Sequence, residues 1–251
     1  MTYKKFAIDL AKQAGKIMRA NFALAMERKW KKDGSPVTET DLKINKLVIA
    51  RVKKYFSGHG VLGEEESYHS EGKEYLWVCD PVDGTVPFSH GIPTFAFSLA
   101  LVKNGKPILG VIYDAALDHL YVAEAGKGAH MNGRKIKVNK SGLKNSVAFW
   151  DQKTVSHLVL RYPKVFWLNL YSICYEAITV AAGHTVAAFY DYSYAHDIAA
   201  IKVIVEEAGG KVTDKFGKEQ RYDGRINGAL ISNGVVHEDL LKMIKKYHKW
   251  Q

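Results

Sequence analysis

The sequence predicts a layered αβαβα sandwich of mixed α+β and α/β character, with an antiparallel N-terminal sheet and a mixed C-terminal sheet. Three observations lead to this fold class. An amphipathic helix lies near the start of the chain, β-rich runs joined by short turns follow it, and strands alternate with helices in the second half. We therefore expect residues 1–251 to form a single domain, subdivided into an α+β half over about 1–140 and an α/β half over about 141–251.

The first segments combine two helices with a loop between them. Apolar residues recur every three or four positions over residues 6–22, which predicts a helix with one face on the core. A loop containing turn residues follows it. Thr40 or Asp41 is expected to cap a second helix that continues through Val52. This prediction places Asp41 at a helix start.

Acidic residues follow the first two predicted strands. The apolar pair Val61-Leu62 leads into a run of glutamates that begins at Glu64, and a strand over 75–79 leads directly into Asp80. Both strands therefore deliver carboxylates to their ends.

The remaining segments divide into a meander and an alternating half. Turn residues such as Asn104-Gly105 separate the β-rich runs of the meander, which is typical of antiparallel strands. These strands are predicted over 95–102, 107–113 and 119–123. Beyond a linker at 139–145, strands are predicted at 147–150, 165–168, 186–190 and 229–232. Helices are predicted at 172–182, 198–208 and 237–247.

The composition is that of an ordinary globular protein, with 47% hydrophobic and 25% charged residues. No apolar run approaches the roughly 18 residues of a membrane span, so we expect a cytoplasmic protein without a membrane partner. Cys79 and Cys174 are too few for a disulfide framework. The net charge of +10 fits either a lysine-rich solvated surface or an attraction for anions, and without a recognisable nucleic-acid-binding motif we do not expect a nucleic-acid partner.

The segment DPVDGT, which begins at Asp80, is the main candidate for a functional site. A turn at the end of a strand would bring the Asp80 and Asp83 carboxylates and the Val82 carbonyl toward one point, and such hard oxygen ligands suit Mg²⁺. Gly84 permits close approach of the backbone to a ligand, and Thr85 can open a helix whose free N–H groups bind phosphate. A cation and a phosphate would then meet in one turn.

Taken alone, each acidic position also has a purely structural interpretation. Pro-Val-Asp-Gly is a common β-turn sequence, and consecutive glutamates at Glu64 are typical of a solvated loop. Asp197 could simply cap the helix expected at 198–208. The combination is more specific, because acidic residues stand at three ends of strands or starts of helices.

Four sequence blocks resemble the inositol monophosphatase family of lithium-sensitive, magnesium-dependent sugar phosphatases. The blocks follow the family's order between residues 37 and 210 and span most of the chain. They are VTETD from Val37, GEE from Gly63, WVCDPVDGT from Trp77, and HDIAA from His196 leading to VEEAGG from Val205. The resemblance implies a phosphoric monoester hydrolase that uses two or three Mg²⁺ ions, is inhibited by lithium and forms a homodimer.

The resemblance also implies roles for individual residues. The implied metal ligands are Glu64, Asp80, the Val82 carbonyl, Asp83 and Asp197, with Asp80 bridging two ions. The implied catalytic residues are Asp41, Glu64 and Thr85, which would orient and deprotonate a water that attacks phosphorus. The implied substrate contacts are Gly84, Thr85, Ser172, Tyr190 and Asp191.

The chain departs from the family pattern near the expected substrate pocket. His196 stands where the family usually has a tryptophan, and Tyr190 stands where members that act on inositol phosphate place an acid. Ile173 replaces a smaller residue and Val186 a common acid. We therefore expect intact catalytic residues beside an altered leaving-group pocket.

Several substrates are compatible with the resemblance. Inositol-1-phosphate, or a similar small polyol or sugar phosphate, is the default anionic substrate. Histidinol phosphate is an alternative favoured by the VAAGH stretch from Val180, and fructose 1,6-bisphosphate and 3'-phosphonucleotides are further ones. A protein that binds RNA or a transcription complex through its positive charge is the alternative from another class.

Overall fold

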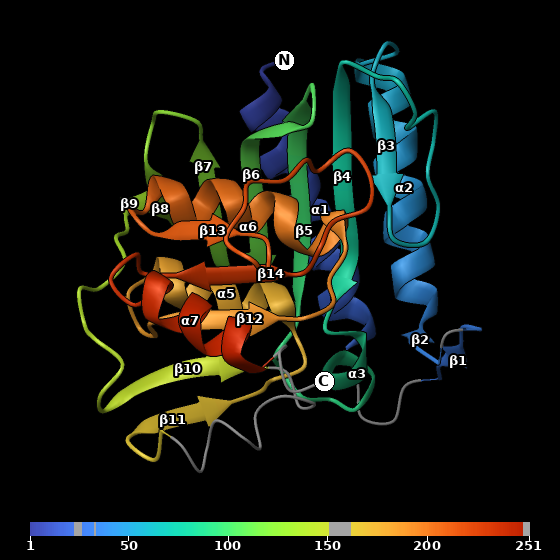
Figure 1. Cartoon of the computed structure of the whole chain (residues 1–251). Coiled ribbons are helices and arrows are strands. Elements are labelled where there is room, and N and C mark those ends of the chain that lie inside the picture. The colour runs from blue at the N-terminus through green and yellow to red at the C-terminus, as the bar shows by residue number, and fades with distance from the viewer. Residues whose placement is uncertain (23–26, 33, 151–161, 248–251) are drawn as a thin grey trace.

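The computed structural model of the chain has five layers of helices and sheets (Figure 1). Helices α1 (Tyr3–Asn21) and α2 (Glu39–Tyr55) cover one face of a seven-stranded sheet, and α5 (Ile173–Ala181) and α6 (Ala195–Glu207) lie between that sheet and a five-stranded one. Helix α7 (His237–Tyr247) packs on the outer face of the second sheet. The αβαβα sandwich predicted from the sequence is confirmed. The structure describes residues 1–22, 27–32, 34–150 and 162–247.

The seven-stranded sheet is built from the first half of the chain. Its strand order follows the sequence from β3 to β9, with β3 parallel to β4 and all other neighbours antiparallel. The predicted antiparallel character therefore holds except at this one edge. The strands are β3 (Gly60–Gly63), β4 (Tyr75–Asp83), β5 (Ala96–Lys103), β6 (Lys106–Asp114), β7 (His119–Glu124), β8 (Ala129–Met131) and β9 (Arg134–Lys135). A small antiparallel pair, β1 (Lys29–Trp30) and β2 (Pro36–Val37), lies in the segment that was predicted as a loop.

The five-stranded sheet is mixed, as predicted. Its order is β11-β10-β12-β14-β13; β10 pairs in parallel with β11 and β12, and β14 is antiparallel to β12 and β13. Strand β13 was not predicted, because three residues after two glycines give no clear alternation of apolar and polar positions. The strands are β10 (Ser146–Trp150), β11 (Val165–Leu168), β12 (Ala187–Tyr190), β13 (Lys211–Thr213) and β14 (Ala229–Ser232).

Three apolar clusters join the layers. One lies between the two sheets around α5 and α6, one between the first sheet and α1 and α2, and one between the second sheet and α7. Strand β4 runs between the first two clusters and is buried along most of its length, because helices cover both faces of its sheet. The same cover buries the acids at its end, since Asp80 and Asp83 are only 3% and 4% exposed.

Two predicted helix starts are displaced in the structure. Helix α2 is capped by Thr38 rather than by Thr40 or Asp41; the Thr38 backbone N–H and hydroxyl both donate to Asp41 Oδ2, which lies in the first turn. Helix α6 likewise begins at Ala195, and Asp197 Oδ2 accepts from Tyr194 N at 2.6 Å. An acid three residues after the cap satisfies a backbone donor that the helix leaves free. Asp41 and Asp197 therefore occupy equivalent places in two helices.

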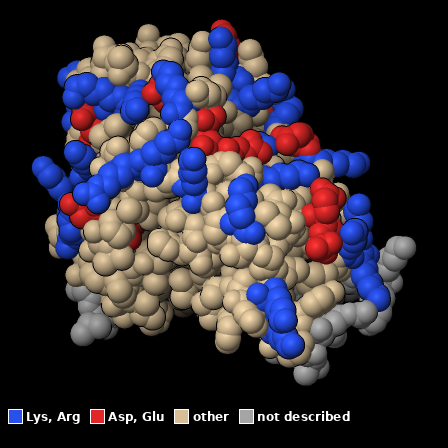
Figure 2. Space-filling model, turned by 90° about the vertical axis from the view of Figure 1, so that its left-hand side faces the viewer, with Lys and Arg blue, Asp and Glu red and all other residues tan. Residues whose placement is uncertain are grey.

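The charged residues are dispersed on the face shown in Figure 2. Lys and Arg side chains lie mainly over its upper part and right side, with acidic side chains among them, and its lower left part is largely uncharged. This distribution agrees with the interpretation of the +10 charge as a solvated surface on this face. Within the described residues, no helix combines the length and the apolar character needed to span a membrane.

Candidate active site

Strand β4 leaves its ladder at the point where the DPVDGT segment begins. Asp80 pairs with Ser98 of β5, the register then shifts, and Asp83 pairs with Ala96. Proline at position 81 has no N–H to give to the ladder, so an irregularity there costs few hydrogen bonds. Asp80 Oδ1 accepts from Val82 N at 3.0 Å across this irregularity. The bulge therefore folds Asp80, Val82 and Asp83 into one short segment.

A left-handed glycine turns the chain from β4 into the short helix α3 (Thr85–Ser89). Gly84 has φ +85° and ψ 41°, and a Cβ at this position would lie 2.7 Å from the Thr94 carbonyl oxygen and 2.9 Å from Ser172 Cβ. Both the backbone angles and the space therefore require glycine. The turn presents the first N–H groups of α3 next to the acids of β4.

Carboxylates from three elements meet at this turn. Oxygen atoms of Asp80, Asp83 and Asp197 all lie within 4.8 Å of one another, and Glu64, Asp80 and His196 offer a second set within the same limit. Burial raises the pKa of Asp80 well above its usual range and raises the pKa of Asp83 and of Asp197 to about 7. The charge of Glu64 adds to each of these shifts. A bound cation would stabilise such a group of buried acids in its ionised form.

The donor set fits a hard divalent cation. Carboxylate oxygens converge from β4, from α6 and from the residue after β3, which is the ligand type that Mg²⁺ and Mn²⁺ prefer. The ammonium of Lys31 already lies at this cluster, 2.8 Å from Glu64 Oε1 and 2.7 Å from Glu65 Oε1. Burial lowers the pKa of Lys31, but the hydrogen bonds to the two glutamates outweigh it and raise the pKa overall. The acidic cluster thus attracts positive charge.

The Asp83 carboxylate is fixed by the N-terminus of α5. Ser172, the N-cap of that helix, donates its hydroxyl to Asp83 Oδ2; Cys174 N donates to the same oxygen at 2.9 Å, and Ile173 N donates to Oδ1 at 3.1 Å. The free N–H groups and the dipole of a helix start both favour a negative charge at this place. Ser172 therefore touches the carboxylate cluster, although the sequence suggested it as a substrate contact.

Thr85 and Asp41 form a buried polar pair behind the turn. Thr85 Oγ1 lies 3.0 Å from Asp41 Oδ1 and 3.0 Å from the Val82 carbonyl oxygen, so its single proton can go to either acceptor. Asp41 is fully buried, and burial raises its pKa. The geometry connects a hydroxyl at the acidic cluster to a carboxylate that can take up a proton.

The two other predicted substrate residues have different surroundings. Tyr190 is 6% exposed and donates its hydroxyl to Glu176 of α5, whose pKa burial raises to about 7. Asp191 Oδ1 accepts from Lys215 Nζ at 2.9 Å. Lys31 and Glu176 were missed from the sequence, because neither a lysine in a basic stretch nor a glutamate within a helix indicates such a contact.

His196 packs at the edge of the cluster. Its side chain is 13% exposed, its ring stacks on Tyr194 with 5.2 Å between centroids, and Nε2 lies 3.5 Å from Asp197 Oδ1. Burial lowers the pKa of His196 to about 4, although the charge of Glu64 opposes this shift.

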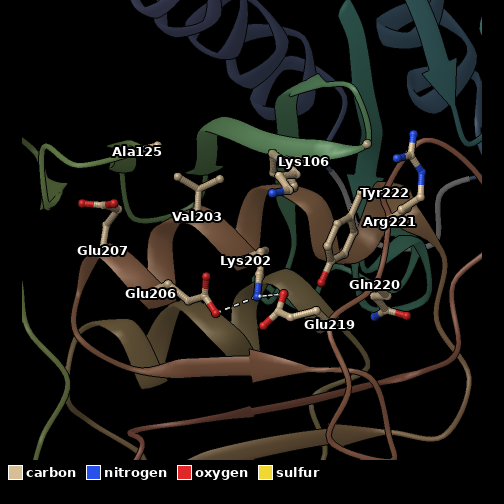
Figure 3. A pocket seen from close by; sticks show the side chains of 12 residues that line it. Lys106, Ala125, Lys202, Val203, Glu206, Glu207, Glu219, Gln220, Arg221 and Tyr222 are labelled. Atoms are coloured by element: carbon tan, nitrogen blue, oxygen red, sulfur yellow. Dashed lines mark hydrogen bonds and ion pairs between the residues drawn. The ribbon is translucent and has the colours of Figure 1, made fainter. Parts of the chain in front are cut away.

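A cavity of about 620 Å³ lies at the other end of α6 and is separate from this cluster (Figure 3). The nearly buried Lys202 ammonium joins its walls, at 2.7 Å from Glu206 Oε1, 2.7 Å from Glu219 Oε2 and 2.9 Å from the Val212 carbonyl oxygen. None of the predicted site residues lines this cavity.

Comparisons with known proteins agree with the fold. The model of the inositol monophosphatase family matches residues 2–249. A fructose-1,6-bisphosphatase/inositol-1-monophosphatase of Thermotoga maritima is 32% identical over 251 residues, which cover 96% of this chain and 95% of that protein. A histidinol-phosphatase of Chlorobaculum parvum is 32% identical over 250 residues, with the same coverage. A solved inositol monophosphatase of T. maritima has a TM-score of 0.89 at 30% identity and covers 98% of this chain and 97% of its own.

Proposed function

The chain belongs to the inositol monophosphatase family and is a phosphate monoester hydrolase, and from this premise we propose that it hydrolyses a small polyol or sugar monophosphate with Mg²⁺ as its cation. Inositol-1-phosphate is the default substrate. The observation that carries the proposal is the convergence of Asp80, Asp83 and Asp197 beside the Gly84 turn. Buried carboxylates at this place would bind a divalent cation, and the cation would bind the phosphate of the substrate.

We propose two neighbouring cation positions at the cluster, or three, as the family resemblance implies. Glu64, Asp80 and the Val82 carbonyl would hold the first, and Asp80, Asp83 and Asp197 the second. Bound Mg²⁺ would lower the pKa of a water and offset the charge that develops on the phosphate and the leaving oxygen. The hydrogen bonds from α5 support this assignment, since they orient Asp83 before any ion binds.

Thr85 and Asp41 are assigned to the proton of the attacking water. When Thr85 donates its hydroxyl proton to Asp41 Oδ1, its oxygen is free to accept a proton from a water next to the cluster. Asp41 is suited to the proton because burial raises its pKa. Glu64, at the same cluster, would assist. Because water is the nucleophile, the reaction needs no covalent bond between phosphate and protein.

The phosphate is assigned to the start of α3. The amides of Gly84 and Thr85 belong to the first turn, where a helix leaves N–H groups without internal partners. Gly84 has no side chain, so none of its own atoms covers these amides. A phosphate there would lie directly beside the carboxylates that hold the cations.

A second candidate substrate is histidinol phosphate. The relative from C. parvum is named a histidinol-phosphatase, and at position 190 this chain has a buried tyrosine in place of the acid of inositol-specific members. Tyr192, two residues after β12, is 78% exposed, with Lys215 Nζ 5.4 Å from its ring centre. If Tyr192 contacts the leaving group, its ring suits histidinol, an alcohol that carries an imidazole, as well as a polyol. Fructose 1,6-bisphosphate and 3'-phosphonucleotides are further candidates, and the T. maritima relative is named a fructose-1,6-bisphosphatase/inositol-1-monophosphatase.

The oligomeric state and the cellular compartment are also part of the proposed function. We propose a homodimer, which is supported by the edge strand β11, where Phe166 and Leu168 are 65% and 46% exposed. We propose that residues 1–251 act as one phosphatase domain in the cytoplasm; the two free, buried cysteines are compatible with a reducing compartment.

Phosphate release from a panel of esters tests the function. The purified protein should hydrolyse inositol-1-phosphate or histidinol phosphate with Mg²⁺ and not with EDTA, and Asp83→Asn should reduce kcat at least about 100-fold. Asp239→Asn, at an exposed position of α7, is the matched control. Absence of phosphate release from every ester with Mg²⁺ present would reject the proposal, and RNA binding that survives Asp83→Asn would favour the alternative class.

A further inference from the structure

His196 brings a nitrogen donor to a cluster that otherwise consists of oxygen atoms. One ring nitrogen of His196 and one carboxylate oxygen each of Glu64 and Asp80 all lie within 4.8 Å of one another. The three residues come from three different elements: the residue after β3, strand β4 and the first turn of α6. The fold, rather than local sequence, therefore assembles this set.

The surroundings of the ring leave its nitrogens able to bind a cation. Tyr194 stacks on the ring face, with 14° between the planes, whereas the lone pair of an imidazole lies in the ring plane. The contact from Nε2 to Asp197 Oδ1 is 3.5 Å, which is too long for a strong hydrogen bond. A tryptophan at this position, as in most of the family, could stack in the same way but could not coordinate a metal.

Building on the cation positions proposed above, we propose that His196 is an additional ligand of the first position, and that this position therefore binds a divalent transition ion such as Co²⁺ or Mn²⁺ in preference to Mg²⁺. Three ligands spaced evenly around one such ion, each at about 2.0–2.2 Å, lie about 3.5–3.8 Å apart. Because the three atoms of Glu64, Asp80 and His196 all lie within 4.8 Å of one another, binding one ion needs them to approach by about 1 Å at most. Glu64 must also release Lys31, with which it is paired at 2.8 Å.

The preference follows from the chemistry of the donors. Imidazole binds borderline ions well, whereas Mg²⁺ strongly prefers oxygen and keeps its waters. Adding one nitrogen therefore strengthens binding of ions along the series from Mn²⁺ to Co²⁺ and Zn²⁺ much more than that of Mg²⁺. The second position, which contains Asp80, Asp83 and Asp197, keeps oxygen ligands alone.

Metal-binding measurements on the metal-free protein test this assignment without reference to activity. Pulsed electron paramagnetic resonance of the Mn²⁺-loaded wild type should show coupling to a ¹⁴N nucleus, and growth on ¹⁵N-histidine should change that coupling. His196→Gln and His196→Trp should remove it and weaken the Kd for Co²⁺ about 10-fold or more, while the Kd for Mg²⁺ changes less than about threefold. His184→Gln, at an exposed histidine, is the control.

The outcomes separate this inference from the proposed function. Absence of nitrogen coupling in the wild type, or unchanged Co²⁺ affinity in both His196 variants, would overturn the ligand role even if Mg²⁺-dependent hydrolysis were intact. The isotope experiment needs no variant, so a folding defect at position 196 does not affect it. Nitrogen coupling in a protein that hydrolyses no phosphate ester would leave the metal site in place and reject the proposed function instead.

Discussion

Replacing Asp197 by Asn should stabilise the metal-free protein while removing its reaction. Burial raises the pKa of Asp197 to about 7 despite the hydrogen bond from Tyr194 N, and the charge of Glu64 adds to the shift. The ordinary value is 3.8. The folded state therefore binds the proton more tightly than the unfolded state, so ionisation of Asp197 destabilises the fold as pH rises from about 4 through about 7.

The magnitude follows from the shift. A rise of about three pKa units corresponds to about 4 kcal/mol of lost stability at pH 7.5, where the group is ionised in both states. Asn keeps an oxygen that can accept from Tyr194 N, but the loss of charge at a helix start costs about 1 kcal/mol. The net gain for Asp197→Asn is about 3 kcal/mol at pH 7.5. It falls to near zero at about pH 4.5, where the unfolded-state carboxyl begins to bind protons.

Unfolding of wild type and variant in EDTA at the two pH values measures this difference. A gain of about 3 kcal/mol corresponds to a Tm higher by roughly 6–12 °C at pH 7.5 for a chain of this length. Asp239→Asn is the control, since it removes an acid from the first turn of α7 that is 67% exposed and should change stability by less than about 0.5 kcal/mol. Equal stability of Asp197→Asn and wild type at pH 7.5, or the same gain at both pH values, would show that ionisation of Asp197 does not destabilise the fold.

Three further predictions concern other parts of the molecule. Thr85→Ala should lower kcat about 100-fold with little change in KM, because it removes the hydroxyl that connects the water to Asp41. Thr85→Ser should restore most of the rate. Equal loss of kcat in both variants, measured by steady-state kinetics, would contradict this role. Lys31→Met should tighten Mg²⁺ binding severalfold in calorimetry, because Glu64 loses a competing cation, and weaker binding would count against the competition. Lys202→Met should lower the free energy of unfolding in urea by about 1–2 kcal/mol, since Glu206 and Glu219 can be hydrated in its absence, and should leave kcat unchanged. A large loss of kcat would instead indicate coupling between this cavity and the acidic cluster along α6.

The order of the elements and the acidic residues at their ends were predictable from the sequence. The apolar run at residues 75–79 leads into Asp80, although β4 itself continues to Asp83, and Asp197 lies near the start of an apolar helix. Both patterns lie within a few neighbouring residues, so they can be recognised without knowing how the elements pack. The convergence of these acids is a property of the structure, and the roles assigned to them stay predictions until they are measured.

Contacts between distant segments were not predictable in the same way. Tyr190 was expected at the substrate, but all four residues of β12 are buried because layers cover both faces of its sheet, and alternation then cannot tell which side chains point toward the site. The pairing of Lys31 with Glu64 spans 33 positions. The cap of α2 was placed two or three residues too late, because Thr38, Thr40 and Asp41 are all good capping residues and only the backbone distinguishes them.

The shared position of Asp41 and Asp197 in their helices bears on how relatives of this protein lose activity. Each gives one oxygen to a backbone N–H at a helix start. If selection for catalysis were relaxed, these two positions would still favour short side chains with an acceptor oxygen, and so would Asp80, whose Oδ1 accepts from Val82 N. The Glu64 carboxylate instead accepts from the side chain of Lys31. An acceptor retained at 41, 80 or 197 is therefore a poor marker of a working enzyme, and the residue aligned with Glu64 is the more informative one when inactive homologues are sought.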